Sequence, residues 1–229
     1  SQYGSKIVPP SANSFGSSVA LSFDARTAVA NSFSSVGARV LTRSGSVWTE
    51  QGSIMIDSTE IHAVTISGDG NTVLAGMYNI GSPSPLGSVF VYVRNNGTWT
   101  QQARLAPAGR TEFFGNAVSL SALGNTAIIG APDDNNSTGA AWIFVRSGTT
   151  WTQQAKLVGT GAVGNAHQGY TVALSSDATT AIVGGPWDNN DLGAAWVFAR
   201  NGNTWNQQAK LVGMGAVGPS GQGLSVSLS

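Results

Sequence analysis

One stretch of this sequence is written twice. The segment from Gly193 to Gly218 repeats the segment from Gly139 to Gly164 with few substitutions, as GAAWVFARNGNTWNQQAKLVGMGAVG follows GAAWIFVRSGTTWTQQAKLVGTGAVG. A chain that repeats a segment at a fixed spacing folds as an array of similar units, because each unit buries its hydrophobic faces against a neighbour of the same shape. The repeat therefore constrains the fold more than any other feature of the sequence.

The repetition extends over the whole chain. Trp48, Trp99, Trp151 and Trp205 follow one another at nearly equal intervals, each in a phrase such as TTWTQQ. Three more phrases, typified by TVALS, TAIVG and GAAWVFAR, recur between the tryptophans in a fixed order. The phrases are rich in β-branched or aromatic residues and are bounded by Gly, Asn, Asp or Ser, which is typical of β-strands.

Four strands in each unit of about fifty residues predict a β-propeller. We expect an all-β fold with almost no helix, in which residues 1–229 form a single β-propeller domain or a fragment of one. Four complete blades are expected at residues 15–57, 61–107, 114–159 and 169–213, and parts of a split blade at 1–14 and 214–229.

The split blade raises the question of how the array closes. It is represented only by an outer-type strand at Ser5–Val8 and an inner-type strand at Gly223–Ser229. Three explanations stay open: the chain is part of a longer array, a compact ring leaves these ends over, or a neighbouring chain completes the blade. Because unpaired strand edges associate readily, the chain itself is an expected partner, as a homo-oligomer or filament.

Composition limits the partners further. Charged residues are 10% of the chain and the formal net charge is zero. Nucleic acids and anionic lipids both require a basic surface, so we expect neither nucleic-acid binding nor membrane insertion. The absence of cysteine excludes disulfides and zinc–thiolate sites. The start at Ser1 indicates a processed chain. The composition alone favours a secreted protein, extracellular or at the cell surface.

Particular residues give the repeat a family likeness. Phe15-Gly16 and Phe114-Gly115 precede inner strands, and Gly130-Ala131-Pro132 follows the next strand. This pattern resembles FG-GAP repeats, the blades of the integrin α-subunit propeller and of some fungal and bacterial lectins. The likeness covers essentially the whole chain, although Gly169-Tyr170 and Gly223-Leu224 stand in place of Phe-Gly in the last two units.

The family's calcium site does not transfer to this chain. Many FG-GAP blades bind calcium through a D-x-D-x-D-G loop between the first two strands. The corresponding loops here, SFDARTA, SGDGNTV, SALGNTA and SSDATTA, hold at most one carboxylate each. Calcium takes six to eight oxygen ligands, several of them charged. We therefore expect no cofactor and no metal site in these loops.

The loops between the second and third strands are the candidate binding site. They combine aromatic residues with Asp and Asn, the mixture that suits a sugar ring and its hydroxyls. The alternative is that Asp-Asn runs are ordinary turn formers. A weak Ca²⁺ site at the same rim loops also stays open. The candidate ligand-binding residues are Tyr78, Asp133, Asp134, Asn136, Trp187, Asp188, Asn190 and Asp191.

Other motifs indicate no chemistry. The segments at positions 159–164 and 213–218 fit G-x-G-x-x-G, but a strand follows each of them, where a dinucleotide site needs a helix. His62 and His167 are not echoed in the other units and have no carboxylate or cysteine next to them in the sequence, so packing or solvent exposure is the expected role. We assign no catalytic residue and expect that the chain is not an enzyme.

These observations favour two functions. The first is an extracellular, non-enzymatic β-propeller that acts as an adhesion or structural repeat protein and assembles with itself by strand complementation. The alternative is a carbohydrate-binding, lectin-like module that binds glycans through the rim loops. A hydrolase is a distant third, since fold alone excludes no function.

Overall fold

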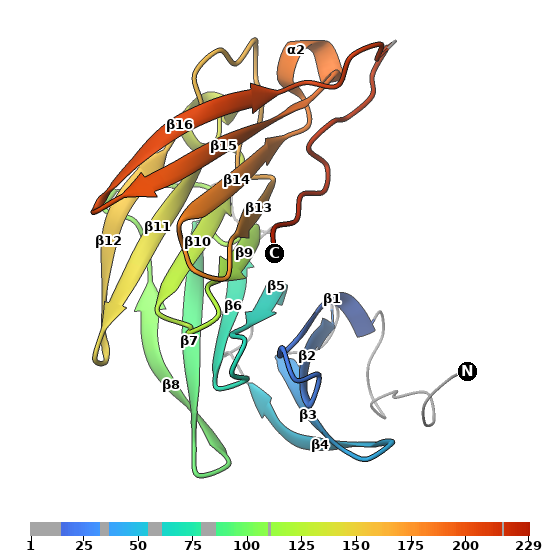
Figure 1. Ribbon diagram of the computed structural model, residues 1–229, viewed down its shortest axis with the longest axis vertical. Coiled ribbons are helices and arrows are strands. Elements are labelled where there is room, and N and C mark those ends of the chain that lie inside the picture. The colour runs from blue at the N-terminus through green and yellow to red at the C-terminus, as the bar shows by residue number, and fades with distance from the viewer. Residues whose placement is uncertain (1–14, 33–36, 55–60, 79–85, 110, 217) are drawn as a thin grey trace.

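The computed structural model describes residues 15–32, 37–54, 61–78, 86–109, 111–216 and 218–229. These residues form four antiparallel sheets of four strands each, and in every sheet the strands lie side by side in chain order. Figure 1 shows the four sheets following one another around an arc that is open on one side. The prediction of an all-β propeller array with four four-stranded blades is confirmed.

The strands occupy the recurring phrases of the sequence. Blade 1 consists of β1 (Phe15–Leu21), β2 (Thr27–Ser32), β3 (Ala38–Ser44) and β4 (Val47–Ile54). Blade 2 consists of β5 (Ile61–Ile66), β6 (Thr72–Tyr78), β7 (Gly87–Asn95) and β8 (Thr98–Leu105). Blade 3 consists of β9 (Ala117–Leu120), β10 (Thr126–Ala131), β11 (Ala140–Ser147) and β12 (Thr150–Leu157). Blade 4 consists of β13 (Thr171–Leu174), β14 (Thr180–Gly185), β15 (Ala194–Asn201) and β16 (Thr204–Leu211).

The same irregularity recurs in each blade. The register between the third and outer strands shifts between Val40 and Leu41, and likewise between Val91 and Tyr92, in blades 1 and 2. Blades 3 and 4 shift at Ile143/Phe144 and at Val197/Phe198. A bulge increases the local twist of the outer edge, and its repetition shows that the blades are copies in geometry as well as in sequence.

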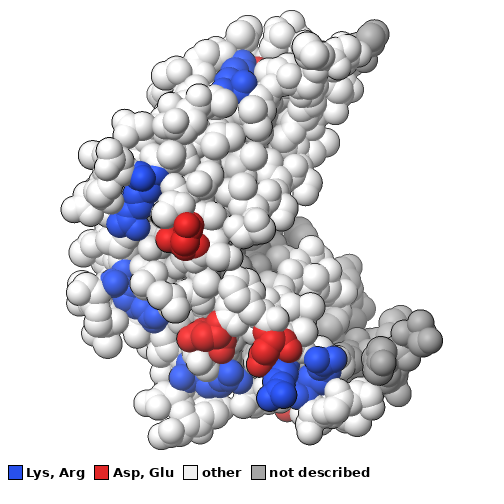
Figure 2. All heavy atoms as spheres, in the orientation of Figure 1, with Lys and Arg blue, Asp and Glu red and all other residues white. Residues whose placement is uncertain are grey.

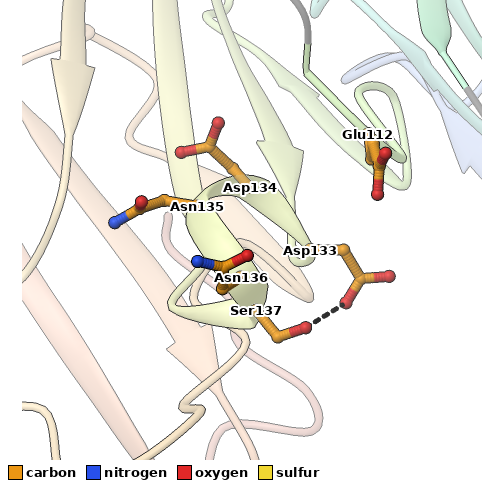
Figure 3. A pocket seen from close by; sticks show the side chains of 6 residues that line it. All are labelled: Glu112, Asp133, Asp134, Asn135, Asn136 and Ser137. Atoms are coloured by element: carbon orange, nitrogen blue, oxygen red, sulfur yellow. Dashed lines mark hydrogen bonds between the residues drawn. The ribbon is translucent and has the colours of Figure 1, made fainter. Parts of the chain in front are cut away.

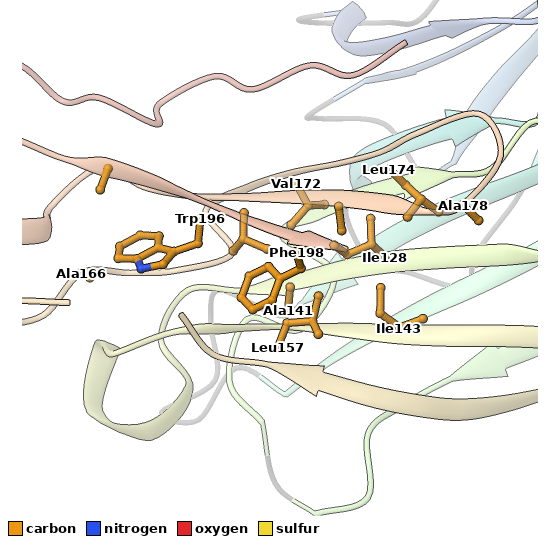
Figure 4. Packing of buried hydrophobic residues seen from close by; sticks show 13 residues of the cluster. Ile128, Ala141, Ile143, Leu157, Ala166, Val172, Leu174, Ala178, Trp196 and Phe198 are labelled. Atoms are coloured by element: carbon orange, nitrogen blue, oxygen red, sulfur yellow. The ribbon is translucent and has the colours of Figure 1, made fainter. Parts of the chain in front are cut away.

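The hydrophobic core lies between the blades. We call the face of a blade that packs on the following blade its trailing face, and the opposite face its leading face. At the junction of blades 3 and 4, Ile128 and Ile143 of the trailing face pack against Val172 and Trp196 of the leading face (Figure 4). Two further clusters join blades 1 and 2 and blades 2 and 3 in the same way. Each blade is therefore stabilised mainly by its neighbours.

The recurrent tryptophans take two structural roles. Trp142 and Trp196, on the third strands, are buried at the junctions. Trp151 and Trp205, at the starts of the outer strands, are half-buried, and the Trp205 indole N–H donates to Gln154 Oε1 of the preceding blade at 3.1 Å. Both pairs hold neighbouring blades together.

The structure describes only one of the two parts of the expected split blade. Its first part, residues 1–14, lies outside the described residues. Residues 223–229 are described but form no strand, and an isolated bridge joins Gln222 to Gly193. Among the described residues, no helix is both long and apolar enough to cross a membrane.

Candidate functional site

Two short turns form the rim of blades 3 and 4. The turns α1 (Asp134–Ser137) and α2 (Asp188–Asp191) connect the second and third strands. Asn136 and Asn190 adopt φ values of 54° and 55°, in the left-handed region, and so do their neighbours on both sides in the turns. Asn and Asp tolerate this conformation better than other residues with a Cβ atom. The Asp-Asn runs are thus turn formers, and Asn136 and Asn190 have that backbone role with exposed side chains.

Two of the predicted ligand carboxylates are already engaged. Asp134 Oδ2 lies 2.5 Å from Lys156 Nζ, and Asp188 Oδ2 lies 2.6 Å from Lys210 Nζ. Asp188 is 1% exposed, and its other oxygen accepts the Val163 N–H at 2.7 Å. A buried carboxylate that has a cation and a backbone donor is a structural group. In the structure, Asp134 and Asp188 anchor the rim turns to the outer strands.

Trp187 is the most accessible aromatic residue of the rim. Its side chain is 39% exposed. Its ring centroid lies 4.7 Å from that of His167 and 4.9 Å from that of Tyr170, which meets it edge-on. The indole is therefore held in place by two rings of the same blade while part of its surface faces solvent.

A pocket of about 300 Å³ opens beside Trp187. Both the rim turn of blade 4 and the segment after the outer strand contribute residues to this pocket. Asp191 of the turn and Ser220 of the segment therefore line the same pocket. The lining residues are Pro186, Trp187, Asp191, Pro219, Ser220, Gly221 and Leu224. An aromatic surface with a few polar groups is the usual composition of a small-ligand site.

A second, more polar pocket of about 510 Å³ lies at the rim turn of blade 3. Figure 3 shows Glu112 and Asp133 on one side of this turn, whereas Asp134 and Asn135 point to the other side. Asp133 accepts a hydrogen bond from the Ser137 hydroxyl at 3.2 Å. Both aspartates line this pocket, but Asp133 and Asp134 point to opposite sides of the turn.

Asp133 also connects the two rim turns. Its Oδ1 lies 2.9 Å from Nδ1 of His167, whose ring lies against Trp187. Sequence spacing placed no carboxylate near His167, because Asp133 belongs to the preceding blade. Asp133, His167 and Trp187 are therefore brought together by the docking of blade 3 on blade 4.

Tyr78 takes a packed position on the rim of blade 2. Its ring is stacked on His62 at 3.8 Å between centroids, nearly parallel at 9°, and it meets Phe113 edge-on at 4.8 Å. Its hydroxyl lies 3.4 Å from Asn116 Oδ1. Tyr78 and Trp187 are therefore not equivalent, since only the indole lines one of the pockets described above.

The loops that hold calcium in related blades are closed here by hydrogen bonds. The Ser22 hydroxyl donates to Asp24 at 2.6 Å, and the Ser175 hydroxyl donates to Asp177 at 2.7 Å. The pKa of Asp24 lies below its ordinary value because of the bonds from Ser22 and from the Arg26 N–H. Within the described part of the chain, no group of three or more His, Cys, Asp or Glu residues is arranged to hold a metal ion.

Sequence reasoning missed Gln168. Gln168 and Gly169 align with Phe114 and Gly115, because the Gly115 and Gly169 N–H groups donate to equivalent carbonyls, those of Gly130 and Gly184. The glycine of the Phe-Gly pair is thus retained, and the aromatic residue is replaced by a glutamine with no exposed surface. The dipeptide Gln-Gly at 168–169 and again at 222–223 was the signal that could have revealed it.

The motif glycines make close backbone contacts between blades. A Cβ atom on Gly130 would overlap the carbonyl oxygen of Gly169 in the next blade, and one on Gly76 would overlap that of Gly115. The spacing of glycines in the repeat therefore reflects backbone-to-backbone contact at the inner edge of each junction.

This fold defines the protein as a β-propeller, and the solved structures agree. The chain is similar to a putative 6-phosphogluconolactonase from Bacteroides uniformis ATCC 8492, with a TM-score of 0.61 and 12% identity over 85% of this chain and 54% of that one. It is also similar to the C-terminal WD40 domain of Sif2, with a TM-score of 0.53 and 16% identity over 86% of this chain and 48% of that one. The chain thus spans about half the length of each.

The repeats identify the propeller more closely. Residues 99–144 and 151–198 match the model of the FG-GAP repeat, so the resemblance seen in the sequence is supported in these two segments. FG-GAP repeats are typical of extracellular or cell-surface proteins. Among curated proteins, the comparison finds no match.

One prediction from the sequence is wrong as it was stated. We expected that the chain is not an enzyme, but a solved structure of similar fold is named a putative 6-phosphogluconolactonase. The propeller fold is therefore no ground for excluding catalysis. At 12% identity the likeness shows the fold alone, so enzyme status is not established in either direction.

Proposed function

We propose that this FG-GAP propeller protein binds carbohydrate in the pocket beside Trp187, and that it acts in adhesion outside the cell through this binding. The observation that supports the proposal is an indole that is 39% exposed within a pocket of about 300 Å³. Large aromatic side chains are normally well buried, and an exposed one held rigidly in a concavity is typical of binding sites.

The aromatic surface suits the apolar face of a sugar ring. Trp187 is supported from behind by His167 and Tyr170, so a ligand that packs on its free surface does not have to order it first. Preorganisation of this kind reduces the entropic cost of binding.

The polar groups at the pocket suit hydroxyls. Asp191 supplies acceptors, and the Ser220 hydroxyl, which also donates to Leu192 O at 2.8 Å, supplies an acceptor with its lone pairs. Sugar hydroxyls both donate and accept hydrogen bonds. The carboxylate of Asp191 and the hydroxyl of Ser220, beside the indole, can therefore bind a sugar that carries no charge. The small pocket volume favours one or two sugar rings as the bound unit.

Carbohydrate binding also accounts for the two functions indicated by the sequence. A repeat propeller that binds glycans at a cell surface is an adhesion protein, so the lectin-like and adhesion roles are one activity in this proposal. A calcium requirement is not part of it, because Asp134 and Asp188 already form ion pairs with lysines.

The test is titration of the full chain with a panel of free sugars, monitored by tryptophan fluorescence and by calorimetry. The panel consists of glucose, galactose, mannose, fucose and N-acetylglucosamine. We expect at least one sugar to bind, and Trp187→Ala to weaken it roughly tenfold or more, since truncation of an aromatic anchor costs about 2 kcal/mol. Thermal stability should change little, and EDTA should leave the affinity unchanged.

Leu123→Ala serves as the matched control. Leu123 is 72% exposed on a hairpin turn of blade 3 and lines neither pocket described here, so binding should be unaffected. Binding by Trp187→Ala at the affinity of the unaltered chain would remove this pocket as the site, and no binding to any sugar of the panel would contradict the proposal.

A further inference from the structure

The segments that follow the outer strands of blades 2, 3 and 4 share one position beside the rim. Phe113, His167 and Gly221 occupy this position. In each segment the N–H group three residues later donates to the carbonyl of this residue at 3.1 Å. The φ values of the three residues are 54°, 52° and 58°. The backbone is therefore the same in the three segments, and only the side chain differs.

The side chains at this position pack on the rim of the preceding blade. The ring of Phe113 meets that of Tyr78 of blade 2 edge-on, at 4.8 Å between the centroids. Nδ1 of His167 lies 2.9 Å from Oδ1 of Asp133 of blade 3. In both cases an aromatic ring fills the space between the segment and the rim.

Gly221 leaves the corresponding space open on blade 4. Its N–H group donates to the Asp191 carbonyl at 2.8 Å, as the N–H group of His167 donates to the equivalent rim carbonyl at 2.9 Å. The segment therefore approaches the rim in the same way, but it brings no side chain. Trp187 begins the rim turn here, as Asp133 does in blade 3, and both Trp187 and Gly221 line the pocket of about 300 Å³.

We propose that Gly221 determines the specificity of this pocket, and that a single pyranose ring binds in the place of the missing side chain. This inference rests on the proposed function, to which it adds the size of the ligand and the residue that sets it. A pyranose ring is comparable in size with the ring of phenylalanine. One ring therefore fills the space beside Trp187, and a second ring of an oligosaccharide lies outside it.

The backbone conformation does not by itself require glycine at position 221. A φ of 58° lies in the left-handed region, which glycine adopts more easily than residues with a Cβ atom. Phe113 and His167 nevertheless adopt this conformation in the equivalent segments. The turn thus accepts a side chain, and the consequence of glycine at this position is the space that it leaves.

A side chain at position 221 would reduce the pocket directly. A Cβ atom on Gly221 would lie 2.8 Å from Cδ1 of Leu224, which also lines the pocket. Leu224 is 52% exposed, and the end of its side chain can rotate away from a methyl group. A methyl group therefore narrows the pocket, whereas an aromatic ring fills it.

The test compares Gly221→His with Gly202→His in the titration with the sugar panel. Gly202 has a φ of 60° in a hairpin turn of blade 4, and a Cβ atom there meets nothing within 4 Å. Both variants therefore place histidine in the same backbone conformation, but only one of them reaches the pocket. We expect Gly221→His to bind the sugar roughly tenfold more weakly or worse. Gly202→His should bind as the unaltered chain does, and the two variants should have similar melting temperatures.

Two further measurements test the size of the ligand. Gly221→Ala should have an affinity between those of the unaltered chain and Gly221→His, because a methyl group only narrows the pocket. The disaccharide of the sugar that binds should have about the same affinity as the monosaccharide, since its second ring makes little contact. If Gly221→His loses its cooperative unfolding transition, Gly221→Ala decides by the same comparison.

The outcomes separate this inference from the proposed function. A sugar that binds equally well to Gly221→His and to the unaltered chain, but more weakly to Trp187→Ala, would overturn the role of Gly221 and leave the sugar site standing. A disaccharide that binds roughly tenfold more tightly than the monosaccharide would overturn the single ring. Failure of every sugar to bind the unaltered chain would contradict the proposed function, and this inference with it.

Discussion

At the scale of single residues, Gln168 shows how the repeat replaces an aromatic core residue with a polar one. Its amide donates to the Gly159 carbonyl at 2.9 Å, and its Oε1 accepts the Gly159 N–H. Both backbone groups lie in the turn between blades 3 and 4, where water is excluded. The glutamine therefore acts as a clamp that satisfies the two groups at once.

Replacement of this clamp should destabilise the junction. Gln168→Leu keeps the size of the side chain but leaves a buried N–H and a buried C=O without partners, and we expect a loss of about 3 kcal/mol in the free energy of unfolding. Chemical denaturation measures it. The same change at Gln222, which makes the same contacts to Gly213 but is partly exposed, should cost clearly less. An equal loss at both positions would show that burial of the turn is not the cause.

The Ser–Asp turns make stability depend on pH. Asp69 illustrates the balance, because burial tends to raise its pKa, whereas hydrogen bonds from Ser67 and Asn71 outweigh this and lower it. The pKa of Asp24 and that of Asp177 are also lowered, chiefly by their serine partners. A carboxyl group whose pKa is lower in the folded state stabilises the fold above its unfolded pKa, and this contribution disappears as pH falls through the folded pKa.

The melting temperature should therefore fall as pH decreases below about 4. Replacing Asp24, Asp69 and Asp177 together by Asn should lower the melting temperature at pH 7 and make it less dependent on pH between 7 and 3. Blade 3 provides a natural comparison, since the Ser121 hydroxyl there donates to neutral Asn125 at 3.0 Å. An unchanged pH profile in the triple variant would assign acid sensitivity to other groups.

At the scale of strands and blades, the glycines of the motif set the distance between neighbouring sheets. Gly130→Ala would place a methyl group on the Gly169 carbonyl of the next blade, while Gly130 itself is held in register with Ala141 of its own sheet. We expect a loss of about 2 kcal/mol or more, in line with overpacked cores. Gly52→Ala is the control, because a Cβ there meets nothing closer than Trp99 at 4.0 Å, and thermal unfolding should show almost no change. Equal effects of the two substitutions would contradict the close approach.

The elements could be predicted from the sequence because they depend on local pattern. Alternation of residues, turn glycines and the fixed order of the phrases are enough to locate sixteen strands. The sequence places the left-handed turns of the rim in loops, but it does not predict where their side chains point. The side chains of Asp133 and Asp134 point in different directions because each contacts a different element. Asp134 meets Lys156 of its own blade, whereas Asp133 meets His167 of the next blade.

The contacts of the candidate site could be predicted from the sequence only in part. Trp187 and Asp191 lie at the pocket beside the rim, as the mixture of residue types indicated. The roles of Asp188, which pairs with Lys210, and of Tyr78, which stacks on His62, depend on partners distant in sequence. The spacing of these residues in the sequence does not by itself show that they are in contact, because the pairing of the strands brings them together.

At the scale of the whole molecule, one kind of junction joins the four blades and is used three times. The face drawn in Figure 2 bears charged side chains of both signs, and the formal net charge of the chain is zero. Long-range attraction of a charged ligand is therefore not expected, which suits an uncharged sugar.

Calorimetric titration of the full chain and of Trp187→Ala with the sugar panel tests the account most directly. The account predicts that at least one sugar binds to the unaltered chain, and that Trp187→Ala binds the same sugar about tenfold more weakly or worse. Equal affinity of the two chains for that sugar, or no binding to any sugar of the panel, would contradict the account.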